Sequence, residues 1–94
     1  MSMIKSFKNN KLKKAFLKDD YSGIKPEHIE RCRIILAVIN LAVDIADIDR
    51  PYFNLHPLKG DRKGIWAITV RANWRITFKF ENGDAYILDY EDYH

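Results

Sequence analysis

The sequence predicts an α+β fold in which N-terminal helices pack on a curved antiparallel sheet. Three observations carry this prediction. Apolar residues recur every three or four positions in the first half of the chain, which is the period of an amphipathic helix. After Asp49 apolar and polar residues alternate, as they do in half-buried strands. Asn82-Gly83 then offers a tight turn between two alternating segments.

The size and composition predict one domain that spans residues 1–94. Of the 94 residues, 47% are hydrophobic, which argues against a disordered chain. No apolar run approaches the ~20 residues that a membrane helix needs, and the N-terminus does not resemble a signal peptide. A single cysteine cannot form an internal disulfide. We therefore expect a small cytoplasmic domain without membrane contact.

The first elements predicted are a short edge strand and a short helix. Residues 3–7 have the length of an edge strand. Asn10 can cap a helix that ends by residues 21–23. The apolar positions of this helix are Leu12, Ala15 and Phe16. Its other face is lysine-rich.

A longer helix is expected to begin at Pro26, which suits a first helical turn. Its stripe of apolar residues, spaced by three or four, predicts one face packed in the core. The stripe consists of Ile29, Cys32, Leu36, Ile39, Val43 and Ala46. We interpret Cys32 as a small core residue rather than a nucleophile. His28 lies off the stripe and is expected to face solvent.

Three strands are expected at 65–70, 74–80 and 85–90, the last two joined by Asn82-Gly83. A two-residue loop fixes the register of this hairpin. The expected pairs are Glu81 with Asp84, Lys79 with Tyr86, Thr77 with Leu88, and Arg75 with Tyr90.

The register predicts one apolar and one polar sheet face. Trp74, Ile76, Phe78 and Phe80 are expected to share a face with Ala85 and Ile87. Arg75, Thr77 and Lys79 then lie beside Tyr86 and Tyr90, and a continuing strand adds Asp92 and His94. Basic and aromatic side chains mixed on one sheet face resemble an RNA-binding surface.

Three groups of residues can carry chemistry. The loop 54–64 holds His56 with three cations, Lys59, Arg62 and Lys63, and Arg75 lies on the polar sheet face. The chain ends in Glu91-Asp92-Tyr93-His94. RNA cleavage by the 2′-hydroxyl needs a base, an acid and cations that stabilise the phosphorane. A zinc site is disfavoured because no close pair of ligands is present, and we expect no metal and no cofactor.

Each group also has a purely structural interpretation. A lone histidine in a proline-containing loop is more often structural than catalytic, and chain termini often fray. The first 25 residues carry seven lysines and two aspartates, a charge of +5 that either contacts phosphates or is simply solvated. From these residues alone, the function is that of an RNA-binding or partner-binding domain.

The motifs resemble those of HigB toxins, within the RelE/ParE superfamily of toxin–antitoxin systems. The resemblance covers nearly the whole chain, with its elements in the same order. It is carried by the segments Ile4–Phe7, Leu55–Arg62, Trp66–Arg71, Asn73–Phe78 and Asp92–His94. It implies a RelE-like, microbial-RNase-like fold and an endoribonuclease that cleaves messenger RNA in the ribosomal A site and so stops translation.

The resemblance also implies site residues. His56 and Lys59 match the active-site loop, Arg75 matches a sheet arginine, and Asp92, Tyr93 and His94 match the C-terminal cluster. It implies proton transfer or its orientation for His94 and Asp92, with His56 as the competing base. Lys59 and Arg75 would stabilise the phosphorane, and Tyr93 would stack on or orient a base. No free glutamate and no second arginine are evident in this set.

The implied partners are a helix-turn-helix antitoxin of the HigA type and the 70S ribosome with its ribosomal and messenger RNA. The RNA-binding or ribosome-binding residues expected are Lys11, Lys13, Lys14, Lys18, Arg62, Lys63 and Lys79. The lysines of the first helix have two candidate partners, ribosomal RNA and an acidic antitoxin surface.

Besides a decayed, inactive toxin homologue, which is disfavoured because no residue of the motif set is lost, two alternatives remain at this point. One is a non-enzymatic ParE-like toxin that inhibits DNA gyrase by binding, which would not need His56 or the C-terminal Asp92–His94 triplet. The other is an interaction module whose exposed tyrosines contact a protein, for which Arg75→Ala would leave toxicity intact.

Overall fold

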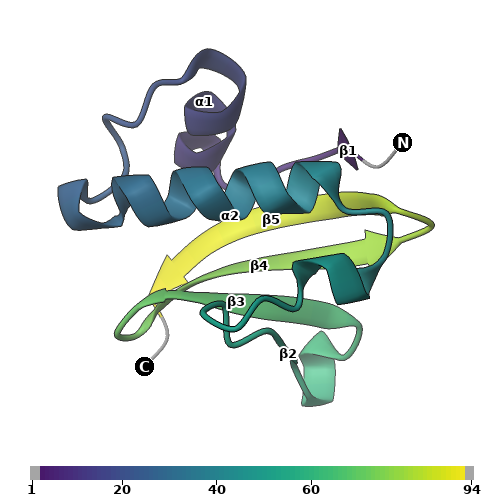
Figure 1. The fold of residues 1–94 in the computed structure, drawn as a ribbon. Helices are drawn as coiled ribbons and strands as arrows, with labels where there is room; N and C mark the ends of the chain where they lie inside the picture. The colour runs from purple at the N-terminus through teal and green to yellow at the C-terminus, as the bar shows by residue number, and fades with distance from the viewer. Residues whose placement is uncertain (1–2, 93–94) are drawn as a thin grey trace.

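The computed structural model describes residues 3–92, in which two helices cover one face of a curved sheet (Figure 1). The helices are α1 (Asn10–Lys18) and α2 (Ile29–Leu41). The strands are β1 (Met3–Ile4), β2 (His56–Pro57), β3 (Ile65–Arg71), β4 (Trp74–Glu81) and β5 (Asp84–Asp92). Short 3-10 turns lie at Pro26–His28 (η1), Ile45–Ile48 (η2) and Gly60–Arg62 (η3). The predicted α+β class is confirmed.

The sheet has the strand order β1-β5-β4-β3-β2. The pairs among β2, β3, β4 and β5 are antiparallel, whereas β1 lies parallel to β5, with Ile4 opposite Ala85. The N-terminal edge strand predicted over residues 3–7 is therefore confirmed only over Met3–Ile4, with an isolated bridge from Phe7 to Leu88 beyond it. The Ile4 backbone N–H also donates to Asn40 Oδ1 at 3.1 Å, which ties this edge to α2.

The N-cap of helix α1 lies one residue before the predicted position. The N-cap is Asn9, not Asn10, and its Oδ1 accepts a hydrogen bond from the Leu12 N–H at 3.0 Å. The helix ends at Lys18, where Asp19 takes a left-handed conformation, before the predicted stop at residues 21–23. Asparagine is a favoured N-cap, so the sequence allows either Asn9 or Asn10 in this role. The hydrogen bond from the Leu12 N–H identifies Asn9 as the cap.

Helix α2 buries the centre of the predicted stripe but not its C-terminal end. Cys32, Leu36 and Ile39 are buried with Ile35, and burial raises the pKa of the Cys32 thiol to about 12, as expected for a core residue. The prediction is wrong for Val43 and Ala46, which are exposed. The helix ends at Leu41 because two aspartates start a new turn. In that capping box the Asp44 and Asp47 carboxylates each accept a hydrogen bond from the other's backbone N–H.

His28 is buried, contrary to the prediction that it faces solvent. Its side chain is only 3% exposed, and its Nδ1 lies 2.6 Å from the hydroxyl oxygen of Tyr90. The prediction failed because the first turn, Pro26–His28, is a 3-10 turn, in which side chains do not follow the α-helical phase of the residues beyond it.

The β4–β5 hairpin follows the predicted register only near its turn. Asn82 and Gly83 both have positive φ, and the pairs of Glu81 with Asp84 and Lys79 with Tyr86 are confirmed. Beyond Lys79 a β-bulge shifts β5 by one residue, so Thr77 faces Asp89 and Arg75 faces Glu91.

The bulge also reverses which face the end of β5 presents. Ile87, predicted to be apolar-facing, has a φ of 50° and is exposed, while Leu88 and Tyr90 are buried in the core. The predicted positions of Tyr90 and of the Arg75–Tyr90 pair are thus wrong. Glu91 takes the place beside Arg75.

Candidate functional site

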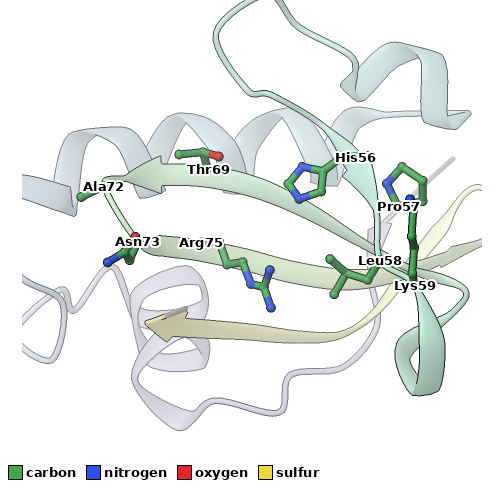
Figure 2. A pocket seen from close by; sticks show the side chains of 8 residues that line it. All are labelled: His56, Pro57, Leu58, Lys59, Thr69, Ala72, Asn73 and Arg75. Carbon is green, nitrogen blue, oxygen red and sulfur yellow. The ribbon is translucent and has the colours of Figure 1, made fainter. Parts of the chain in front are cut away.

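An open cavity lies between the loop 54–59 and the β3–β4 hairpin, on the side of the sheet away from α2 (Figure 2). Its volume is about 400 Å³. Both main-chain segments supply side chains to it. The lining residues are His56, Pro57, Leu58, Lys59, Thr69, Ala72, Asn73 and Arg75. Three of the residues predicted from the sequence, His56, Lys59 and Arg75, therefore meet in one place.

His56 is held in one orientation by its own loop. Its Nδ1 lies 2.7 Å from the carbonyl oxygen of Asn54. Since a carbonyl only accepts, Nδ1 carries the hydrogen and donates it. In the neutral ring, Nε2 then has the free lone pair that can accept a proton. Figure 2 shows the ring beside the cavity, above β3 and β4. This is the geometry that a general base requires.

The loop that carries His56 is fastened to β3. Asn54 has a φ of 51°, and its Nδ2 donates to Thr69 Oγ1 at 3.3 Å. The Thr69 N–H donates to the Phe53 carbonyl at 3.0 Å. From α2, Arg31 donates to the backbone carbonyls of Tyr52 and Thr69, the latter at 3.1 Å from Nη2. The position of His56 therefore depends on the body of the fold.

A carboxylate clamp, formed by Arg62, Arg75, Thr77 and Glu91, adjoins the cavity through Arg75. Arg62 binds both carboxylate oxygens of Glu91, at 2.7 and 3.0 Å. Arg75 donates to Glu91 Oε1 from Nε and Nη2, at 3.1 and 2.9 Å. The buried Thr77 hydroxyl donates to Oε2 at 3.2 Å. Hydrogen bonds from Arg62, with those from Arg75, lower the pKa of Glu91 to about 2.

The carboxylate clamp places two guanidinium groups beside the loop of His56. Glu91 fixes the plane of the Arg75 guanidinium, whose side chain is only 12% exposed. A guanidinium held in this way is preorganised for an anion, because no reorientation is needed when negative charge develops. This part of the site can therefore stabilise a phosphorane.

The sequence did not indicate the glutamate or the second arginine of the carboxylate clamp. Arg62 was predicted only as an RNA-binding residue, and Glu91 was left without a role. Their meeting depends on the bulge at Ile87, which brings Glu91 rather than Tyr90 opposite Arg75. The cavity also includes Asn73, on the β3–β4 turn, which sequence reasoning had not selected. The positive φ of the preceding Ala72 turns the chain at this point.

The other predicted site residues are distributed around this centre. Asp92 pairs with Trp74, one position beyond the Arg75–Glu91 pair, at the end of β5. The prediction that it shares a sheet face with Arg75 is wrong, because after the bulge Asp92 alternates with Glu91 and falls on the face of Trp74 and Tyr90. Tyr93 and His94 lie outside the described residues. Lys63 is exposed just after η3, and Lys79 forms an ion pair with Glu81 at 2.7 Å.

Helix α1, which carries four of the predicted lysines, lies on the helical side of the sheet (Figure 1), and none of its residues lines the cavity. These lysines are all exposed: Lys11, Lys13, Lys14 and Lys18. The basic residues thus form two separate surfaces, one around the cavity and one on α1.

Residues 3–92 offer neither a metal site nor a membrane span. No three histidine, cysteine or acidic side chains there gather in an arrangement that holds a metal ion. None of the helices in this range has the length and apolar character to span a membrane.

The fold and the site together define a small basic α+β domain of the RelE-like class, with a histidine and several cations in an open cavity. Residues 5–94 match the family model described as the RelE-like toxin of type II toxin–antitoxin system HigB. The chain belongs to this HigB-like toxin family. It is 56% identical over 92 residues to the endoribonuclease HigB of Proteus vulgaris. The aligned region covers 98% of this chain and 100% of that protein. As a type II toxin it has an antitoxin partner.

Proposed function

We propose that this toxin is a ribosome-dependent endoribonuclease that cleaves messenger RNA in the A site and halts translation. The endoribonuclease activity is supported by 56% identity to a protein of that name along nearly the whole chain. One observation carries the assignment of the site. His56, with Nε2 as the acceptor of its neutral ring, shares a cavity with Lys59 and Arg75.

The reaction that fits this site is an internal transfer of the phosphodiester. His56 Nε2 removes the proton of a ribose 2′-hydroxyl, whose oxygen then bonds to the adjacent phosphorus. The bond from phosphorus to the 5′-oxygen breaks, and an acid protonates that oxygen. The products are a 2′,3′-cyclic phosphate and a 5′-hydroxyl. Lys59 and Arg75 stabilise the negative charge of the phosphorane.

The C-terminal residues complete the proposed site. We assign the acid to His94 and its orientation to Asp92, and we assign Tyr93 to stacking on or orienting a base, as the family resemblance implies. The reverse assignment, with His94 as base and His56 as acid, uses the same residues and predicts the same products.

The proposed partners follow from the proposed reaction. The ribosome presents the message to a cavity that is open to solvent. Because translating ribosomes are in the cytoplasm, the toxin acts there. The partner antitoxin is proposed to be a helix-turn-helix protein of the HigA type. A gyrase-binding toxin of the ParE type is disfavoured because binding alone would not require the oriented His56 or the arginines of the carboxylate clamp.

Mapping messenger RNA ends tests the proposal. Purified protein is added to a reconstituted translation system, and 5′ ends are located by primer extension with and without ribosomes. Wild-type protein should create new in-frame ends only when ribosomes are present, and Arg75→Ala and a deletion of His94 should both abolish them. Cleavage of naked RNA at the same rate would refute ribosome dependence. Intact message with normal translation would refute the nuclease assignment.

A further inference from the structure

A second cavity lies across the β3–β4 turn from the first. Its volume is about 370 Å³. Ala72, labelled at the end of the hairpin in Figure 2, lines both cavities, so the turn separates them by very little chain. The residues that line the second cavity are Lys25, Glu27, His28, Arg71, Ala72 and Trp74. None of them except Ala72 belongs to the first cavity.

The second cavity has an aromatic wall. The Trp74 ring is half-buried and packs on the ring of Tyr90, with 4.5 Å between the two ring centroids. Tyr90 is itself in the core. The ammonium group of the exposed Lys25 lies 5.3 Å from the Trp74 ring centroid. A lysine side chain is flexible and can move aside, whereas the tryptophan is fixed from behind. The wall can therefore accept a planar ring.

A buried histidine contributes a polar group of fixed orientation. The Tyr90 hydroxyl oxygen lies 2.6 Å from His28 Nδ1, which holds the imidazole ring in place. His28, only 3% exposed, lines the cavity and can present a ring nitrogen to a bound polar group.

The charges in the cavity favour an anion that carries other polar groups. Lys25 and Arg71 are exposed cations, and Glu27 is the single carboxylate among the lining residues. A phosphate suits the two cations, an amino or hydroxyl group suits Glu27, and a base suits Trp74. A simple anion would leave the aromatic wall unused. A nucleotide uses all three features.

We propose that this second cavity is a subsite for an RNA nucleotide next to the cleaved one, with Lys25 and Arg71 on its phosphate and Trp74 against its base. The proposal rests on the proposed function of the first cavity, because an RNA strand bound there reaches the second by passing over Ala72 and Asn73. The nucleotide comes either from the message or from ribosomal RNA, since both offer the same chemistry.

Cleavage kinetics on ribosomes test the subsite. The double variant Lys25→Gln/Arg71→Gln is compared with Lys5→Gln/Arg50→Gln, which removes the same charge at exposed positions that line neither cavity. The first double variant should lower kcat/KM about tenfold, through KM, because two phosphate contacts are lost. The control should stay within about twofold, as expected when the total charge alone changes little. Equal kcat/KM for the two double variants would overturn the proposal.

Cross-linking identifies the source of the nucleotide. Thiouridine is placed on either side of the scissile position in a message made uncleavable by a 2′-deoxy substitution, and separately in ribosomal RNA near the A site. A cross-link to Trp74 itself, from either RNA, supports the subsite and identifies its source. Absence of any RNA cross-link to Trp74 would overturn it. Failure of the first-cavity assignment is seen separately, as full cleavage by His56→Gln.

Discussion

At the scale of single residues, Glu91 is the carboxylate that holds the arginines of the proposed site. Its carboxylate binds both arginines near the cavity and accepts the Thr77 hydroxyl hydrogen bond. Its charge opposes the approach of phosphate, yet it fixes the guanidinium planes. Glu91 is therefore a positioning residue. The carboxylate weakens phosphate binding, but the Arg75 guanidinium that it orients can stabilise the transition state without first having to reorient.

Replacing Glu91 should separate these two effects. Glu91→Gln should lower kcat about ten- to hundredfold, because Arg75 loses its fixed orientation, while KM stays equal or falls. The free energy of unfolding should fall by about 1–2 kcal/mol, since the ion pairs are partly exposed to solvent. Steady-state cleavage and urea unfolding measure the two quantities.

The matched control is Glu81→Gln, which removes a carboxylate paired with Lys79 on the same strand as Arg75. It should change kcat and KM by less than about twofold, as expected for an exposed pair outside the site. A Glu91→Gln variant with unchanged kcat, or with a raised KM alone, would show that Glu91 does not position the arginines.

At the scale of elements, α2 and the turn before it connect the helical layer to both cavities. Arg31 of α2 holds the loop of His56 through the carbonyls of Tyr52 and Thr69. At the other end His28, in η1, contacts Tyr90 of β5 and the ring of Trp74 in β4. The helical layer thus sets the geometry of the functional face, although it lies on the opposite side of the sheet.

The His28 junction predicts that stability falls in mild acid. Burial lowers the pKa of His28 below its ordinary value of about 6.5, and Lys25 and Arg71 act in the same direction while Glu27 opposes them. The unfolded chain then binds more protons than the folded one below that pH, so stability rises with pH. The contribution of neutral His28 is complete above pH ~6.5 and is lost as the pH falls through the lower, folded pKa.

Urea unfolding at pH 7.5 and 5.0 measures this effect. Wild-type protein should be less stable at pH 5.0, and His28→Gln, which does not titrate, should show a smaller difference between the two pH values. Glu91, with a folded pKa of about 2, keeps its charge over this range, and an unfolded glutamate, with a pKa of about 4.3, starts to protonate only near pH 5, so Glu91 contributes little to the difference. An equal pH dependence in both proteins would mean that His28 is not the group responsible.

At the scale of the whole molecule, patterns of period two and period 3.6 predicted the layers but not the local irregularities. The strands 65–71 and 74–81 and the Asn82-Gly83 turn follow from alternation and turn chemistry. The bulge at Ile87 does not, because an isoleucine with positive φ is forced by tertiary packing rather than by its own preference. That one residue decides whether Tyr90 or Glu91 lies beside Arg75.

For the candidate site, too, the residues given by motif and residue type were predicted, and those that depend on the irregular register were not. His56, Lys59 and Arg75 were predicted from their residue types and motif positions, and the structure brings all three to one cavity. Glu91 and the pairing of Arg62 with it were not found, because they depend on the shifted register. His28 was assigned to solvent because the 3-10 turn Pro26–His28 breaks the α-helical phase.

The central claim is that a phosphodiester bond of messenger RNA is cleaved in the cavity beside His56. Two lysines of the loop 54–64 test this claim most directly. Lys59 lines the cavity, whereas Lys63, four positions later and also exposed, does not. Single-turnover cleavage of ribosome-bound message is measured at saturating toxin for Lys59→Gln and Lys63→Gln, so that the rate reports the chemical step and not the RNA binding expected of Lys63. The Lys59 variant should lose about a hundredfold or more in rate, as for loss of one group that stabilises the developing charge, and the Lys63 variant less than about threefold. Equal rates in the two variants would contradict the assignment of this cavity as the active site.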